Sequence, residues 1–599
     1  MSDMGDLSIV RIASEMMYTA RPQWCVNLYP MNRAGFLALL FTVLSFASAR
    51  AEEACSQPQS RTFVSYRIQP ASIDGHLALK VELTFRFENR SAIDLVLPSE
   101  WQGATELYKS IHQLTVLSKA SLTGGSETPS RRHLSFERGK LVRLEYLFQP
   151  MTENPISGVS FRPVLNSDFF VLTGRNFLIY PDIPEHDLIS VSVEWANFPA
   201  GWNLADSLGV DESCQHATAL LKLTEGLFVG GDFRLQKAAS ASPQVYLAIR
   251  GKWQFDDVAL AELAANVITT ERQFWNDRDL ASYVLALVPL DAPAGEYGGA
   301  AIEGGFLMFM SPGTQLSSDV QFLFAHEVFH IWNPVQLGEL TPKNPVYWFT
   351  EGFTDYYARL LLLRASLMNR QKYTDEVNAV YSDYMSSPAR NYGEQQVNAQ
   401  YFNDSNAQRL PYLQGALLAL KWNANIDERS NGTKSLDDAM RLLKRKAKVS
   451  EQVLSDQSLA SLLADLAGPE VVTDIRDAIQ LGKTIPLPPK ALGPCFHLEK
   501  KPLYTFEAGF DVNSIYRNGI IQGVKQESEA HKAGLRNGQL VTRSSSIDPN
   551  NPNQAIEMTV LDAGMSKRVR YFPRTAALEI DQYEFVADSD HHCELAALH

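Results

Sequence analysis

The chain contains 599 residues, which is too long for one hydrophobic core and indicates about three or four domains. Hydrophobic residues make up 45% and charged residues 20% of it, the proportions of an ordinary folded protein. The formal net charge of -14 argues against nucleic acid or an anionic membrane as a partner, and its simplest meaning is solubility.

The N-terminal region predicts export of the protein. Residues 1–30 are mixed in character and suggest an upstream extension, whereas from Met31 a short positive region leads into an apolar run, Gly35–Phe46. Ala49-Arg50-Ala51 then supplies an A-x-A cleavage site, so residues 31–51 have the layout of a secretory signal peptide. An uncleaved anchor is the alternative, although the apolar run is short for a membrane span. We expect a periplasmic protein without a stable membrane span.

Four cysteines would remain after signal cleavage, because Cys25 precedes the signal. An even number in an exported protein fits disulfides. The simplest pairing joins Cys55 to Cys214 and Cys495 to Cys593, so that each bond brackets a domain. Free buried thiols are the alternative.

Residues 52–250 predict a β-rich N-terminal domain. Apolar and polar residues alternate in Phe63–Ile68, Leu79–Phe87 and Leu141–Phe148, as they do in half-buried strands. Clusters of Gly, Pro, Asn and Ser separate these runs. Val245–Arg250 is either the last strand of this domain or the first strand of the next.

Residues 251–490 predict a mostly helical domain, because the apolar residues change to helical spacing after Trp253. Ser435 is placed to cap one helix, with two aspartates in its first turn. The other expected elements are a strand at 283–289 and helices at about 256–275, 346–370 and 410–426. Pro486–Lys490 indicates a linker to the tail.

The tail, residues 491–599, returns to strands. Ala508-Gly509-Phe510 is expected at the start of one strand, and Ala533–Gly538 follows a short helical stretch. These features resemble a PDZ domain, in which a glycine-aromatic loop leads into the strand that pairs with a peptide's C-terminus. An unrelated small β domain is the alternative.

The sequence His326-Glu327-Val328-Phe329-His330 is an H-E-x-x-H motif. Residues four apart share one face of a helix, so His326 and His330 can hold one zinc ion. Glu327 lies where its carboxylate can take a proton from the attacking water. N-capping residues at 317–319 precede an apolar run, and Asn333-Pro334 offers a stop, so the motif is expected on a buried helix.

A catalytic zinc needs a third protein ligand. Glu351 is the strongest candidate, because it opens a second long helix about twenty residues after the motif, enough to turn back antiparallel to the first. Glu339 and Asp355 are the alternatives. Asp355, one helical turn after Glu351, equally suits a hydrogen-bond acceptor for a ligand histidine or a solvated surface position.

The HEVFH motif followed by WFTEGFTDYY at 348–357 resembles the gluzincin metallopeptidases and, more narrowly, the glycyl aminopeptidase family. His330-Ile-Trp-Asn333 and the stretch 434–441 are similar to text of the same family. The resemblance implies a β-rich front domain, a thermolysin-like catalytic domain and a C-terminal PDZ domain in a multidomain α+β chain. It also implies one Zn2+ ion bound by His326, His330 and Glu351, with Glu327 as the general base.

Two further roles follow from the same resemblance. Gluzincin aminopeptidases carry an oxyanion-stabilising tyrosine in a Tyr-x-Lys-Gly pattern at the start of a later helix, and Tyr412 matches it, with Gln414 in place of the lysine. A core tyrosine packed under the site is the alternative. Glu303, in a glycine-rich stretch, matches the acidic anchor for a substrate's free amine, although a shifted alignment would leave no anchor.

These residues predict a zinc aminopeptidase acting on small peptides. A zinc endopeptidase whose PDZ domain recruits substrate C-termini is the second interpretation. The third is a binding scaffold with a vestigial zinc site, which the presence of all three ligands and the base argues against.

Overall fold

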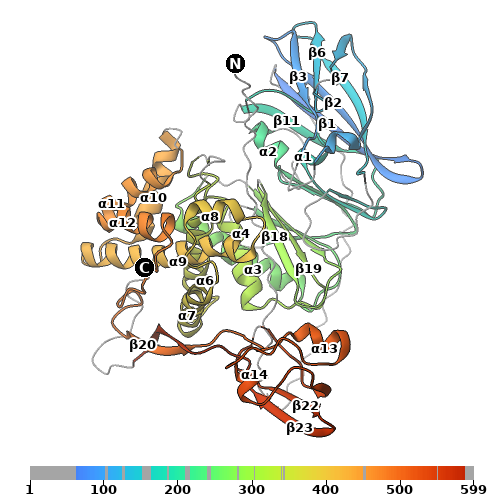
Figure 1. Ribbon diagram of the computed structural model, residues 1–599. Helices are drawn as coiled ribbons and strands as arrows, with labels where there is room; N and C mark the ends of the chain where they lie inside the picture. Colours follow the sequence, from blue (N-terminus) through green and yellow to red (C-terminus); the bar gives the residue numbers. More distant parts are fainter. Residues whose placement is uncertain are drawn as a thin grey trace, which may run out of the picture. The chain divides into compact units, whose positions relative to one another are not determined.

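The computed structural model describes residues 62–586 apart from short internal segments (Figure 1). The internal segments left out are 101–104, 125–127, 152–162, 185–187, 209–215, 239–243, 279–281, 303, 339, 341–344, 450–452 and 550. The predicted extension, the signal peptide, Glu303 and Glu339 therefore lie outside the described residues. The chain forms two compact units, which divide between Ile331 and Trp332, with residues 274–276 belonging to the second.

The N-terminal region is built from β-sheets, as its alternating pattern predicts. A six-stranded sheet has the order β13-β11-β1-β2-β7-β4. Its strands are β1 Phe63–Ile73, β2 His76–Arg86, β4 Ile111–Val116, β7 Val142–Phe148, β11 Leu188–Trp195 and β13 His216–Ala219. The three strands predicted here are confirmed as β1, β2 and β7. Their alternating side chains place one apolar face in the core.

Two four-stranded sheets complete this region. One has the order β10-β3-β6-β5, with β3 Ala92–Val96, β5 Ala120–Thr123, β6 Arg131–Phe136 and β10 Tyr180–Pro181. The other has the order β12-β14-β9-β8, with β8 Val164–Leu165, β9 Phe169–Thr173, β12 Asn203–Asp206 and β14 Leu227–Gly231.

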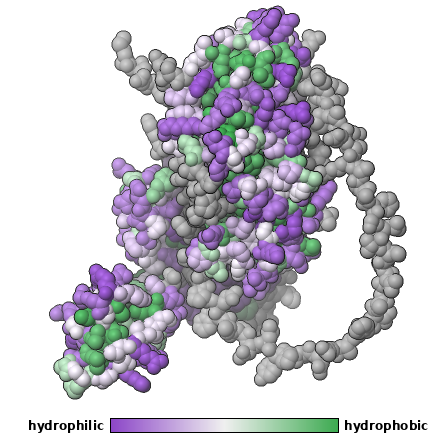
Figure 2. Space-filling model, turned by 90° about the vertical axis from the view of Figure 1, so that its right-hand side faces the viewer, coloured by the Kyte–Doolittle hydropathy of each residue, from purple (hydrophilic) through white to green (hydrophobic). Residues whose placement is uncertain are grey.

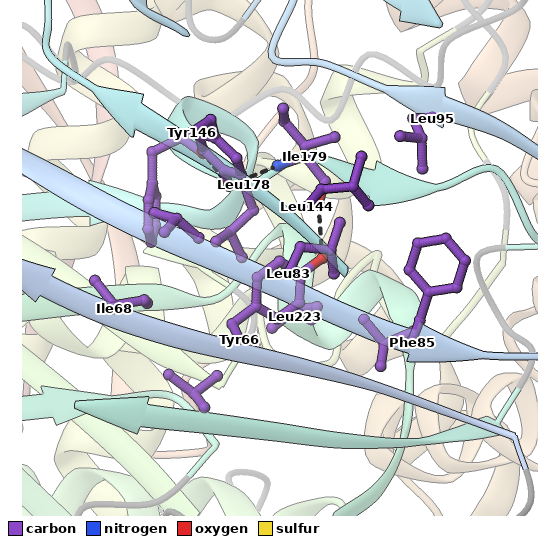
Figure 3. Close-up of a cluster of buried hydrophobic side chains, with 14 of the residues drawn as sticks. Tyr66, Ile68, Leu83, Phe85, Leu95, Leu144, Tyr146, Leu178, Ile179 and Leu223 are labelled. Atoms are coloured by element: carbon purple, nitrogen blue, oxygen red, sulfur yellow. Dashed lines mark hydrogen bonds between the residues drawn. The ribbon is translucent and has the colours of Figure 1, made fainter. Parts of the chain in front are cut away.

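Two buried tyrosines form hydrogen bonds with backbone groups in the core of the front domain (Figure 3). The hydroxyl of Tyr66, on β1, donates to the carbonyl of Ile179 at 2.8 Å. The hydroxyl of Tyr146, on β7, donates to Phe177 and accepts from the amide of Ile179, both at 3.0 Å. Each phenol is thus paired in the apolar interior, where an unpaired hydroxyl would be destabilising.

A five-stranded sheet with the order β15-β16-β17-β19-β18 begins the next region. Its strands are β15 Arg234–Lys237, β16 Gln244–Ile249, β17 Ser282–Pro289, β18 Tyr297–Ile302 and β19 Gly305–Met310. The central strands β16, β17 and β19 are parallel, and β18 pairs antiparallel at the edge. Helix α3, Asp257–Phe274, is the crossover between β16 and β17. The strand expected at 245–250 therefore belongs with the residues that follow it.

Helices dominate from residue 318 to 480 (Figure 1). They are α4 Ser318–Phe329, α5 Tyr347–Thr350, α6 Gly352–Arg364, α7 Arg370–Ser386, α8 Glu394–Gln400, α9 Ser405–Ser430, α10 Leu436–Val449, α11 Asp456–Ala467, α12 Glu470–Asp474 and the π-helix η2 Ile475–Gln480. The expectation of a single helix at 346–370 is wrong. The chain is interrupted between α5 and α6, and Ser366 adopts a left-handed conformation that ends α6. The helix expected at 410–426 is present within the longer α9.

The tail contains α13 Val512–Asn518, α14 Glu529–Lys532 and five strands. The strands are β20 Phe496–Leu503, β21 Leu540–Ser544, β22 Ile556–Asp562, β23 Met565–Tyr571 and β24 Leu578–Phe585. The prediction that residues 508–510 open a strand is wrong. Asp511 caps α13 there, its side chain accepting from the amide of Asn513 at 3.1 Å. Turn and helix thus replace the expected strand.

A two-stranded ribbon, β20 paired with β24, joins the tail to the helical region. The side-chain amide of Asn378, on α7, donates to the carbonyl of Tyr583 at 3.0 Å and accepts from its amide at 2.8 Å. The hydroxyl of Tyr583 also donates to the carbonyl of Pro488. The side chain of Asn378 therefore takes the place of a neighbouring strand along β24.

Within the described part of the chain, no helix is long and apolar enough to cross a membrane. Hydrophilic and hydrophobic residues are interleaved on the face in Figure 2. Cys495 is disulfide-bonded, and the other four cysteines lie outside the described residues. The expected pairing of Cys495 with Cys593 stays a prediction.

Candidate metal centre

Helix α4 carries the H-E-x-x-H motif, and its sequence favours the helix at both ends. The side chain of Ser317 accepts from the amide of Val320 at 3.4 Å, and Asp319 lies in the first turn, where the helix dipole favours a carboxylate. His326 is in the last turn and His330 caps the C-terminus. Both imidazoles are buried, and their Nε2 atoms lie 3.1 Å apart. The two nitrogens are therefore close enough to bind the same metal ion.

Glu351 is the third member of this group. It lies between α5 and α6 and is buried. One ligand atom from each of Glu351, His326 and His330 lies within 4.8 Å of the other two. Among the residues that the structure describes, this is the group of histidine, cysteine or acidic side chains that could hold a metal ion. The alternative Glu339 lies outside those residues.

This donor set fits zinc. Tetrahedral zinc bound to two imidazoles at about 2.0–2.1 Å separates the two nitrogens by roughly 3.3 Å, close to the 3.1 Å found here. A carboxylate beside two imidazoles is also a set of donors that zinc accepts, since zinc binds both histidine nitrogen and carboxylate oxygen. Two histidines and one carboxylate leave a fourth position for water or substrate, the arrangement of a catalytic zinc.

Glu327 is held in place from the sheet. Its side chain is buried, and its Oε2 accepts a hydrogen bond from the amide of Ala301, on β18, at 3.2 Å. Glu327 is adjacent in sequence to the ligand His326, so a carboxylate that is not itself one of the three ligands stands next to the metal position. Residue 303, the predicted amine anchor, follows β18 directly but lies outside the described residues.

Asp355 is fully buried, so the alternative of a solvated surface position is wrong. Its Oδ2 forms ion pairs with Arg359 at 3.2 Å and with Arg409 at 3.6 Å. Arg359 also pairs with Glu376 at 3.5 Å. Asp355 therefore joins α6 to α7 and α9 through a charged network, and its predicted role as acceptor for a ligand histidine stays a prediction.

Sequence reasoning assigned Asn333 no role at the site beyond a stop after α4. Its side-chain Nδ2 lies 3.2 Å from the carbonyl of Phe349, 3.3 Å from that of Thr350 and 3.1 Å from the hydroxyl of Thr354. The residue is fully buried. Asn333 thus ties the segment that follows His330 to the backbone on both sides of Glu351.

Tyr412 lies inside α9, rather than at its start as expected, and is buried. Burial and then the neighbouring charge of Glu351 raise the pKa of Tyr412 well above its usual value, so the phenol remains protonated. Gln414, which stands where the related motif has lysine, donates from Nε2 to the carbonyl of Ala478 at 3.0 Å. Gln414 thus bonds to the π-helix.

Glycines bring α9 close to the Glu351 segment. A Cβ atom on Gly415 would lie 1.7 Å from the carbonyl oxygen of Trp348, and one on Gly352 would lie 2.4 Å from the Cα of Gly415. Neither position can carry a side chain without displacing a helix backbone. This close approach is what sets Tyr412 beside Glu351.

Two other phenols lie near Glu351, and sequence reasoning missed both. The rings of Tyr347, on α5, and Tyr401, which caps α8, stack with centroids 3.8 Å apart at an angle of 11°. Burial, with a further effect of Glu351, raises the pKa of each phenol. Tyr347 lies one helical turn before Glu351 and could have been found by that spacing. Tyr401 has no such signal.

The central part of this chain matches a known family. Residues 319–424 match the family model of the M61 glycyl aminopeptidases. The matched segment contains His326, Glu327, His330, Glu351 and Tyr412. The resemblance stated from the motif text is therefore confirmed over these residues. No curated protein matches the chain.

Solved structures of peptidases are similar to this chain. An aminopeptidase N family protein from Idiomarina loihiensis is 15% identical, with a TM-score of 0.60, and the alignment covers 88% of this chain and 98% of that one. An M1 zinc metallopeptidase from Deinococcus radiodurans is 17% identical over 71% of this chain and 95% of its own, with a TM-score of 0.44. Leukotriene A4 hydrolase from Saccharomyces cerevisiae is 14% identical over 71% and 68%, also with a TM-score of 0.44. The likeness to the Idiomarina loihiensis protein confirms the multidomain α+β architecture, with a β-rich front and a helical region.

Proposed function

We propose that this chain, a zinc metallopeptidase with one zinc ion, acts as an aminopeptidase on peptides. The observation that carries the proposal is the buried group of His326, His330 and Glu351, with Glu327 beside it on the same helix. This arrangement supplies both a metal position and a carboxylate base, the two requirements of metal-assisted hydrolysis. The M61 match over the same residues supports the aminopeptidase class.

His326, His330 and Glu351 would hold the zinc ion. When bound there, the ion would supply Lewis-acid chemistry for the scissile carbonyl and would increase the acidity of water. Glu327 takes a proton from the attacking water and passes it to the departing amine. The hydrogen bond from the amide of Ala301 fixes one carboxylate oxygen of Glu327, so the base is oriented before the substrate arrives.

Tyr412 supplies a neutral donor for the developing oxyanion in this proposal. Its phenol is buried near Glu351, and its raised pKa keeps the proton in place. A buried donor aimed at a developing negative charge is worth more than the same donor in water. Removing one such donor typically lowers kcat about 100-fold to 1,000-fold.

Replacing Glu327 with Gln tests the catalytic assignment. The variant should bind zinc as the wild type does and lose peptide hydrolysis, because the amide keeps the shape of the side chain but cannot accept the proton. Zinc content is measured by elemental analysis, and turnover by mass spectrometry of a peptide-library digest, with a chelator-treated sample as a second control. Wild-type turnover by the zinc-loaded variant would refute the assignment.

The aminopeptidase specificity depends on a group that binds the substrate's free amine, and Glu303 is the proposed anchor. Its place directly after β18, the strand that contacts Glu327, supports this role. Peptides with acetylated N-termini should then resist cleavage, and Glu303→Gln should raise KM for free peptides. Equal cleavage of blocked and free peptides would favour the alternative of an endopeptidase.

We also propose a periplasmic location and a PDZ-like tail that binds peptide C-termini. The signal-like residues 31–51 support the first, and the glycine-aromatic turn at Gly509-Phe510 supports the second. Cell fractionation and N-terminal sequencing of the exported protein test the location. Titration of the full chain with peptides that carry a free or an amidated C-terminus tests the tail, and equal affinity for both would exclude this recognition.

A further inference from the structure

The guanidinium of Arg409 lies against two groups of the site that belong to different helices. Its central carbon Cζ is 5.6 Å from the centroid of the Tyr412 ring, three residues further along the same face of α9. Its Nη1 is 3.6 Å from Oδ2 of Asp355, on α6. Asp355 is fully buried and stands one helical turn after the ligand Glu351. One cation therefore joins the candidate oxyanion donor to the helix that follows a metal ligand.

Neutralisation of Asp355 does not by itself account for Arg409. Arg359, one turn further along α6, already pairs with Oδ2 of Asp355 at 3.2 Å and donates from Nη1 to the Asp355 carbonyl at 2.8 Å. Glu376 is paired as well, with Lys372 at 2.8 Å and with Arg359 at 3.5 Å. Arg409 thus adds a third cation to a group with two carboxylates, and its contact with the tyrosine ring distinguishes it from the other two cations.

This contact suits a support for the ring of Tyr412. A guanidinium within about 6 Å of an aromatic centroid is attracted to the face of the ring, and the attraction is stronger where water is excluded. Tyr412 is buried, whereas the side chain of Arg409 is 32% exposed and reaches inward from the surface to Asp355. Because a catalytic donor has to be held within a fraction of an ångström of its productive position, a fixed cation against the ring bears on the rate.

We propose that Arg409 is a positioning residue that holds the ring of Tyr412, so that the phenol can donate to the oxyanion of the peptide substrate. The inference rests on the proposed function. Arg409 acts through Tyr412 and touches neither the substrate nor the reacting atoms, and no proton passes through the guanidinium. Without this cation the ring can tilt, and the developing oxyanion loses part of its hydrogen bond.

Arg409→Gln tests the proposal, because it removes the cation from the ring and leaves Asp355 paired with Arg359. We expect kcat to fall about tenfold and KM to stay within about twofold, since a misplaced donor weakens binding of the transition state alone. Arg409→Lys should recover most of the loss, because an ammonium can also lie over the ring and pair with Asp355. Rates are expressed per zinc-loaded, folded molecule, so a less stable variant still gives an answer.

Arg441→Gln is the matched control. The side chain of Arg441, on α10, is 35% exposed and lies 3.5 Å from Oδ2 of Asp437, and its guanidinium is 5.3 Å from the ring centroid of Phe274. The control therefore loses the same kinds of contact without involving Tyr412, and its kcat and KM should stay near those of the wild type. An Arg409→Gln rate equal to that of Arg441→Gln, or no recovery in Arg409→Lys, would overturn the inference.

A double-mutant cycle separates positioning from a general structural role. Adding Arg409→Gln to Tyr412→Phe should lower kcat little further, because Arg409 acts only through the hydroxyl of Tyr412. Additive losses would overturn the inference, and so would a raised KM with unchanged kcat, which would make Arg409 a substrate contact. Glu327→Gln distinguishes the two levels: if that variant stays active, the proposed function fails, whereas if it is inactive and Arg409→Gln is normal, only the inference fails.

Discussion

At the scale of single residues, Glu351 has an unusual environment for a buried carboxylate. Its nearest titratable neighbours include the phenols of Tyr347, Tyr401 and Tyr412, whose pKa values its charge raises. Phenols provide hydrogen-bond donors without adding positive charge. Such donors can orient a ligand carboxylate, as the outer partners of a metal site do.

Asn333 holds the backbone on both sides of Glu351. We therefore predict that Asn333→Ala weakens zinc binding about 10-fold to 100-fold, which is the usual loss when a group that supports a metal ligand is removed. The reason is that three acceptors around Glu351 lose the donor that ties them to the His330 segment. The measurement is the zinc content of the protein in a series of chelator concentrations. Asn391→Ala, at an exposed position, is the control, and equal zinc retention by both variants would contradict the prediction.

At the scale of elements, the contact between α9 and the α5–α6 segment determines the geometry of the site. We predict that Gly415→Ala destabilises the fold by about 1–3 kcal/mol, the usual cost of overpacking a well-packed interior. The added Cβ would lie 1.7 Å from the carbonyl oxygen of Trp348, so α9 must move, and kcat should fall because Tyr412 moves with it. Denaturant unfolding and peptide turnover are the measurements.

Gly201→Ala is the control for this prediction. A Cβ atom at Gly201 would have no neighbour within 4 Å, so the substitution tests only the loss of glycine flexibility. If Gly415→Ala had the same stability and kcat as Gly201→Ala, the prediction would be contradicted. The close contact between α9 and the α5–α6 segment would then not be needed for stability or turnover.

The sequence predicted those parts of the site that lie within one element or follow a fixed spacing. The i, i+4 pair of His326 and His330 is set by the helix repeat, and Glu351 follows at a distance typical of the motif. Tyr401 and Asn333 were missed for one physical reason. Their places near Glu351 depend on which segments the tertiary fold brings together, and neither composition nor periodicity encodes that contact.

Among the elements, strands and helices with regular apolar periodicity were predicted well, as β1, β2, β7 and α3 show. The errors fall where local conformation departs from the pattern. The left-handed Ser366 ends α6 inside an otherwise helical stretch, and Asp511 starts α13 where a strand was expected. At both places a turn or capping residue, rather than the apolar periodicity, determines where the element begins or ends.

At the scale of the whole molecule, one half-buried carboxyl group should govern part of the pH dependence of stability. Burial and then the charge of Asp456 raise the pKa of Glu394, on α8, from 4.5 to about 7. Asp456 is itself engaged, accepting from Trp348 and Gln480 at 2.9 Å each. The negative charges of Glu394 and Asp456 therefore repel each other where α5, α8, α11 and the π-helix meet.

The sign of the effect follows from proton binding. The folded state holds the proton of Glu394 more tightly than the unfolded state, so this group lowers the free energy of unfolding as pH rises from about 4.5 to 7, and the deficit stays constant above that range. We predict that Glu394→Gln is more stable than the wild type at pH 8 by about 1–2 kcal/mol, a value reduced for partial exposure to solvent. At pH 4 the two proteins should unfold alike, because both side chains are then neutral. Urea unfolding of both proteins at the two pH values, with zinc conditions matched, measures the difference, and a gap that does not depend on pH would refute the role of Glu394.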